Sequence, residues 1–168
     1  MNRRTLLFAL AVLFPFLAWA APSPREIVEA VYRPGNDDAG WEEKLAQAMG
    51  RKRPFTKAFN AAMRAADAKS PKDEVGWLDF DPVSNSQDPS IHGLTVSVVS
   101  ETPDKATVRA EFRYASTPGS RVSQVFYDFA RENGAWALDD VRGGVVGERD
   151  SNWSLRKMAS AATAPRRR

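Results

Sequence analysis

The sequence predicts an α+β domain in which N-terminal helices pack on a curved four-stranded antiparallel sheet, followed by a short C-terminal helix. Three observations support this prediction. Apolar residues recur at helical spacing before residue 70, polar and apolar residues alternate after residue 90, and Asn133-Gly134 separates two of the alternating segments. Helices that precede a meander of strands are typical of the α+β class.

Three helices are expected in the first part of the chain. The first begins at Ser23-Pro24-Arg25-Glu26, which combines a capping box with proline at the first helical position, and it ends at Pro34-Gly35. The second covers residues 41–49, where Gly50 follows. The third covers residues 55–68 and carries apolar residues at helical spacing, namely Phe55, Phe59, Ala62, Met63 and Ala66.

Four strands are expected next, over residues 94–98, 107–114, 122–132 and 135–142. Asn133-Gly134 is the strongest hairpin signal, because both residues tolerate the positive φ of a type I′ turn. Alternation in the second strand predicts that Phe112 and Tyr114 face the helices, whereas Arg109 and Arg113 face away. Gly143-Gly144 is expected to end the fourth strand, and residues 155–162 are expected to form the terminal helix.

Residues 1–20 have the pattern of a cleavable export signal. Arg3-Arg4 precede an uncharged apolar run, and Ala18-Trp19-Ala20 is a small-x-small site of the kind that signal peptidase cleaves. The run is short for a membrane span, which needs about 20 residues. We therefore expect cleavage after Ala20, a periplasmic or secreted protein, and no stable membrane anchor after cleavage. General secretion and the twin-arginine route both remain open.

Cleavage would leave a single domain over residues 21–160 and a basic tail over residues 161–168, which we expect to be disordered. The chain contains no cysteine, which excludes disulfides and thiolate chemistry. Its formal net charge is +3, but Arg3-Arg4 and the three terminal arginines supply five positive charges. The folded part is therefore close to neutral or slightly acidic and does not indicate nucleic-acid binding.

An acidic segment lies within the long loop expected over residues 69–90. Asp79, Asp81, Asn85 and Asp88 carry the oxygen ligands that calcium prefers. Their spacing does not match an EF-hand, because the turn glycine and the final glutamate are missing. Asp and Asn side chains also commonly bond to backbone amides within loops. We therefore expect no metal site here, with an ordered loop as the favoured interpretation.

Two stretches resemble a known family. Asp79-Phe80-Asp81-Pro82 with Asn85-Ser86-Gln87-Asp88, and later Trp136-Ala137-Leu138-Asp139-Asp140-Val141, resemble bacterial envelope proteins of domain-of-unknown-function family 3828. The resemblance covers residue 24 to about residue 155. It implies an exported domain with the nuclear-transport-factor-2-like, cystatin-type roll and no established catalytic activity. The chain departs from the family in having only Tyr32 where a tyrosine pair is usual.

Eight residues are candidates for binding, either as an apolar pocket or as an exposed anchor for a partner: Trp77, Asp79, Phe80, Asp81, Gln87, Asp88, Trp136 and Asp139. Core packing is the alternative interpretation for the aromatic residues among them.

Asp140 is the candidate for catalysis. Strand alternation places it on the face of Trp136 and Leu138, which is expected to be the core face. Burial there would raise the pKa of its carboxyl group, as a general acid or base requires. The alternatives are that Asp140 sits at the strand end, reaches solvent, or caps a neighbouring loop.

Several kinds of site find no support in the sequence. His92 is the single histidine and cannot form a multi-histidine zinc site. No Gly-x-Ser-x-Gly elbow and no glycine-rich phosphate loop occur, so no cofactor is expected. The leading hypothesis is a non-enzymatic exported binding or adaptor domain for an envelope protein or a small apolar ligand. The alternatives are a roll-fold enzyme that uses an aspartate, and an immunity-type inhibitor of an exported toxin. The oligomeric state is left open.

Overall fold

The computed structural model describes residues 21–35, 39–71, 76–87, 90–117 and 119–165. The expected leader (1–20), Asp88 and the last three arginines lie outside the described residues. The elements follow the order α1 (Pro24–Val31), α2 (Trp41–Ala48), α3 (Lys57–Asp67), β1 (Ile91–Glu101), β2 (Lys105–Tyr114), β3 (Ser123–Glu132), β4 (Ala135–Val145), β5 (Glu148–Ser154) and α4 (Leu155–Thr163). The α+β class predicted from the sequence is confirmed.

Each of the helices α1, α3 and α4 begins at a capping hydroxyl. Ser23 forms the predicted capping box with Glu26, whose carboxylate accepts a hydrogen bond from the Ser23 backbone N–H at 2.8 Å. Thr56 caps α3 and Ser154 caps α4 through their side-chain oxygens. Such caps satisfy backbone N–H groups that the first helical turn leaves without partners.

The sheet is antiparallel throughout, with the strands in sequence order from β1 to β5. Asn133 and Gly134 have φ values of 53° and 79°, and Glu132 pairs with Ala135 across the turn. The predicted hairpin between β3 and β4 is therefore confirmed.

The prediction of four strands is wrong, because the sheet has five. Gly143-Gly144 does not end β4, which continues to Val145 before β5 returns along it. A Cβ atom at Gly143 would lie 2.7 Å from Cζ2 of Trp153. Glycine thus lets the indole of β5 lie directly against β4, which explains why the glycine pair continues the sheet rather than ending it.

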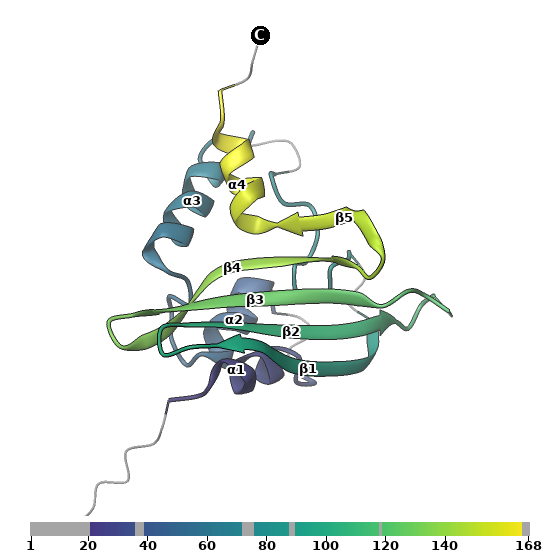
Figure 1. Ribbon diagram of the computed structural model, residues 1–168. Helices are drawn as coiled ribbons and strands as arrows, with labels where there is room; N and C mark the ends of the chain where they lie inside the picture. Colours follow the sequence, from purple (N-terminus) through teal and green to yellow (C-terminus); the bar gives the residue numbers. More distant parts are fainter. Residues whose placement is uncertain (1–20, 36–38, 72–75, 88–89, 118, 166–168) are drawn as a thin grey trace, which may run out of the picture.

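The sheet has an inner face, covered by α1 and α2, and an outer face (Figure 1). Phe112 is 1% exposed on the inner face, where its ring centroid lies 6.0 Å from that of Tyr32. Arg113 is exposed on the opposite face. The predicted register of β2 is confirmed.

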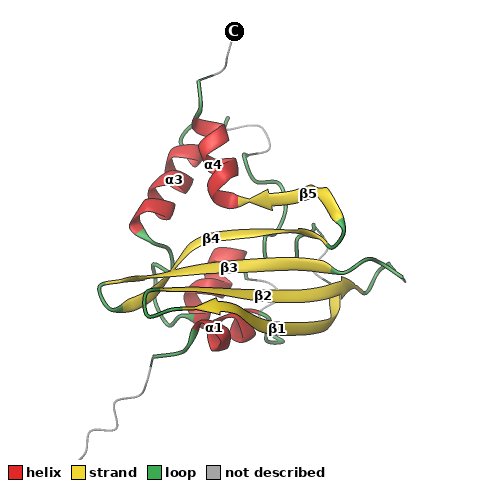
Figure 2. Cartoon of the chain, in the orientation of Figure 1, coloured by secondary structure: helices red, strands yellow, loops and turns green. Residues whose placement is uncertain are grey.

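A second layer of helices lies at the other end of the sheet. α3 packs along α4, and both contact β4 (Figure 2). Phe59 of α3 and Leu155 of α4 are fully buried between them and the rest of the core. Among the described residues, no helix combines the length and apolar character that crossing a membrane requires.

Candidate functional site

Asp140 does not lie on the core face. Phe129 pairs with Leu138 but Asp128 pairs with Asp140, so a β-bulge places Asp139 as an extra residue in β4. One extra residue reverses the alternation after it. Asp140 therefore shares the outer face with Asp128, while Val141 returns to the core. The predicted position of Asp140 beside Trp136 and Leu138 is wrong for this reason.

The carboxylate of Asp140 instead holds the first turn of α4. Its Oδ2 accepts a hydrogen bond from Ser154 Oγ at 2.6 Å, and its Oδ1 accepts one from the Arg156 backbone N–H at 3.0 Å. Burial raises the pKa of Asp140, although these two hydrogen bonds act in the opposite direction. The pKa is raised in the direction expected from the sequence, but the burial occurs beside α4 rather than on the core face. The carboxylate caps a helix rather than a neighbouring loop, so this differs from the alternative of a loop cap as well.

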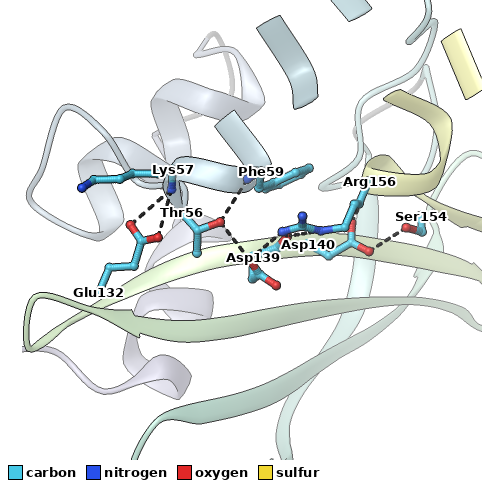
Figure 3. A network of polar contacts seen from close by, with 8 residues as sticks. All are labelled: Thr56, Lys57, Phe59, Glu132, Asp139, Asp140, Ser154 and Arg156. Carbon is cyan, nitrogen blue, oxygen red and sulfur yellow. Dashed lines mark hydrogen bonds and ion pairs between the residues drawn. The ribbon is translucent and has the colours of Figure 1, made fainter. Parts of the chain in front are cut away.

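Asp139 makes the matching contact with α3. Its Oδ1 accepts a hydrogen bond from the Thr56 hydroxyl at 2.8 Å, and Thr56 in turn caps the N–H of Phe59 (Figure 3). The Arg156 guanidinium pairs with the same carboxylate at 2.5 Å. The two aspartates therefore attach the starts of α3 and α4 to one point of β4.

A groove of about 680 Å³ lies beside Asp140, between the outer face of the sheet and α4. Phe126 and Met158 give it apolar walls, and Arg142 and Lys157 add two cations. The Arg142 guanidinium is already paired with Asp128 at 2.6 Å. We call this the outer groove; it is the setting in which Asp140 could meet a small molecule.

The loop that contains the other candidates is held by its own polar groups. Asp81 Oδ1 accepts a hydrogen bond from the Val83 N–H at 2.7 Å, and the Gln87 amide donates to the Asp79 carbonyl at 3.0 Å. Asn85 adopts a φ of 52° and donates to Ser123 Oγ at 2.7 Å. Among the described residues, no three acidic or histidine side chains gather where they could hold a metal ion.

Trp77 and Phe80 are half-buried rather than fully exposed. The Trp77 indole N–H donates to Asp67 Oδ1 at 2.7 Å, which ties the loop to the end of α3. The Phe80 ring meets Trp153 edge-on, with 5.0 Å between the centroids. Part of each aromatic surface therefore serves packing, and the remainder faces the groove described next.

The structure brings five of the predicted binding residues to one surface. A groove of about 530 Å³ is lined by Trp41 and Leu78 together with Asp79, Phe80, Asp81 and Gln87. An adjoining hollow of about 300 Å³ shares Trp41 and Leu78 and adds Trp77, Glu42 and Asp67. We refer to both together as the Trp41 groove, after the residue at the start of α2 that they share.

The Trp41 groove has an apolar floor and an acidic rim. Its acids are Glu42, Asp67, Asp79 and Asp81, and the described residues that line it include no lysine or arginine. Lys44 reaches Asp81 from below at 3.9 Å, but its side chain is nearly buried. Burial, together with the charge of Asp67, raises the pKa of Glu42. The rim therefore carries negative charge that a cationic partner would relieve.

Two predicted binding residues lie elsewhere. Trp136 is buried near the β3–β4 turn under the guanidinium of Arg131, whose Cζ lies 4.2 Å from the ring centroid. Asp139 bonds to Thr56 at the start of α3 instead. His92 lies within β1 rather than in a loop. The eight predicted binding residues do not include Trp41 or Leu78. Trp41 is one of the aromatic residues that the sequence offers for an apolar pocket or an exposed anchor, whereas nothing in the sequence singles out Leu78.

A comparison with models of known protein families gives no match. The chain is similar to the uncharacterized protein YqhG of Escherichia coli strain K12, with 28% identity over 145 residues. The alignment covers 82% of this chain and 45% of the relative, so the chain spans less than half of that protein's length.

Proposed function

We propose that the chain is an exported, periplasmic binding domain without catalytic activity, and that its Trp41 groove holds a segment of an envelope protein. One observation carries the proposal: three half-buried apolar side chains, Trp41, Leu78 and Phe80, lie beside four acids in a groove whose described lining residues include no lysine or arginine. Apolar anchors surrounded by charge are the usual composition of a recognition site.

The chemistry of the groove specifies the partner. Trp41 and Leu78 lie at the boundary of the two hollows and would contact an apolar side chain. Asp79 on one side and Glu42 on the other would attract a lysine or arginine next to it. The proposed partner segment therefore carries an apolar residue flanked by basic residues.

The proposal also includes the export route and the finer fold. The pattern of residues 1–20 supports export and cleavage near Ala20. The order of three helices and then an antiparallel meander supports the nuclear-transport-factor-2-like roll. A sheet covered on one face by helices suits such a role, because it holds the loop between α3 and β1 on a rigid base.

The test compares two charge reversals on exposed aspartates in loops. Asp79→Lys alters the rim, whereas Asp104→Lys alters the β1–β2 turn far along the chain. Envelope proteins captured by the mature domain would be quantified by mass spectrometry, and the affinity of each captured protein measured at low and high salt. Asp79→Lys should reduce capture at least about tenfold, and binding should weaken with salt. Equal capture by both variants would reject the Trp41 groove as the binding site.

A second candidate function is acid–base catalysis by Asp140. The specific observation is that Asp140 lines the outer groove and has a pKa raised by burial. Its two hydrogen bonds to the start of α4 favour the structural role. Loss of function in cells carrying Asp140→Asn, with normal accumulation of the folded protein and normal partner binding, would establish catalysis in place of the binding role.

A further inference from the structure

The two edges of the sheet differ in how they are protected. β5 is short, carries the charged residues Glu148, Arg149 and Asp150, and leads directly into α4. β1 is 11 residues long and has no proline, lysine or arginine. Natural sheets usually protect an edge with charge, brevity or a covering element, because an edge strand has unpaired backbone groups. Two bulges interrupt β1, between His92 and Thr95 and between Val98 and Ser100, and the stretch between them is the less protected part of the two edges.

β1 also carries an apolar row that the helices leave partly uncovered. Val96 pairs with Ala110 and Val98 with Val108, and both partners are fully buried on the inner face. Val98 is nevertheless 42% exposed and Leu94 is 38% exposed, so α1 contacts β1 but leaves these two side chains partly uncovered. Gly93, at a φ of 65°, and Leu94 both lie in the bulge between His92 and Thr95, and Leu94 is two residues before Val96 in the strand.

The row is self-complementary. If a second β1 runs antiparallel to the first about a two-fold axis at Val96, the two copies of Val96 face each other and Leu94 faces the second copy's Val98. Thr95 then faces Ser97 on the outer face, so the pairs from residue 94 to residue 98 match in polarity, while Val99, which is 53% exposed, faces Gly93. No charged side chain lies between His92 and Ser100 to oppose the approach. A two-fold arrangement of this kind uses the same patch on both copies.

We propose that two copies of the chain associate through β1, in antiparallel register about Val96, to form one continuous sheet. The pairing satisfies the outward-facing backbone groups of β1 and covers Leu94 and Val98 of both copies. A single pair of strands buries less surface than a typical permanent interface, so the association depends on protein concentration. This inference is independent of the Trp41 groove, which lies on the α2 side and uses none of these residues.

The absence of cysteine allows a direct test of the register. In the proposed dimer, the two copies of residue 96 face each other at a separation that suits a disulfide. Residue 98 of one copy lies four positions along the strand from residue 98 of the second copy, and this separation is too long for a disulfide. Mature Val96→Cys should therefore form a covalent dimer under mild oxidation, whereas Val98→Cys, a matched valine on the same face, should not. Crosslinking of both variants alike, of Val98→Cys alone, or of neither would overturn the proposal.

A second measurement does not depend on disulfide chemistry. Val96→Lys places two lysines opposite each other across the two-fold axis and should raise the dissociation constant of the dimer at least about tenfold in sedimentation experiments. Val146→Lys is the control, because Val146 is 45% exposed in the β4–β5 turn, outside the proposed contact. A wild-type protein that remains monomeric at high concentration, or equal dissociation constants for the two variants, would also contradict the proposal.

Discussion

Asp140 of β4 accepts a hydrogen bond from Ser154, the residue that caps α4, with 2.6 Å between the two oxygen atoms. The neighbouring Asp139 makes the equivalent bond to Thr56, the cap of α3. The bulge allows consecutive residues of one strand to reach two different helices. The junction between the sheet and the α3–α4 layer therefore depends on two carboxylates and two hydroxyls.

The first prediction concerns the effect of pH on Asp140. Burial raises its pKa in the folded protein above the usual value of 3.8. Folding therefore favours the neutral form of Asp140 and stabilises the protein when that form is present. This stabilisation is complete below the pKa of Asp140 in the unfolded chain, and it is lost as the pH rises through the pKa of Asp140 in the folded protein. The free energy of unfolding of wild type should decrease relative to that of Asp140→Asn over this range.

Urea denaturation of both proteins at several pH values from about 3 to 7 would measure the difference. At low pH, Asp140→Asn should itself change the free energy of unfolding little, because the amide, like the neutral carboxyl group, offers one acceptor oxygen and one donor to the start of α4. A wild type that gains stability over the variant as the pH rises would show that the carboxylate is favoured in its charged form, contrary to this assignment.

The second prediction concerns Gly143. A methyl group at this position would lie 2.7 Å from both the Gln124 carbonyl oxygen and the Trp153 ring. Gly143→Ala should therefore destabilise the fold by about 1–3 kcal/mol and alter the near-ultraviolet circular dichroism of the displaced indole. Gly76→Ala is the control, since its nearest contact would be Ser70 Oγ at 3.8 Å. Similar stabilities for the two variants would mean that Trp153 does not pack against β4.

The third prediction concerns calcium. The loop that includes Asp81 is ordered by its own hydrogen bonds, and the Asp81 carboxylate already contacts the Val83 N–H and Lys44. Millimolar calcium should therefore leave the melting temperature of the mature protein unchanged. An ion present at 100 times its dissociation constant would add about 2.7 kcal/mol of stability. A rise in melting temperature that a chelator reverses would establish a metal site here.

The fourth prediction concerns processing. Small residues at positions 18 and 20 should direct cleavage so that the mature protein begins at Ala21. Amino-terminal sequencing of protein from a periplasmic extract measures this directly. Recovery of the chain with Arg3 and Arg4 still attached would show that the leader is retained.

The sequence by itself determined the α+β class, the starts of α1, α2 and α4, and the β3–β4 hairpin. The prediction that the third helix begins at Phe55 is wrong, because Thr56 caps α3 and Phe55 pairs with Leu138 of β4. The features that the sequence determined depend on local chemistry. Ser23 and Glu26 are three residues apart and cap one turn, while Asn133 and Gly134 are adjacent and tolerate the backbone angles of one turn. The alternation in β2 likewise needed only neighbouring residues to place Phe112 in the core.

Only the tertiary structure decided the bulge at Asp139, the fifth strand and the Trp41 groove. The bulge accompanies long-range bonds, in which Leu138 donates its N–H to the Pro54 carbonyl and accepts from the Thr56 N–H. The alternation of residues in the sequence gives no sign of the bulge, so the prediction from alternation placed Asp140 on the wrong face. The Trp41 groove joins residues about 40 positions apart in the chain. Their closeness in space depends on how α2 and the loop before β1 pack together, and the periodicity of the sequence carries no information about that packing.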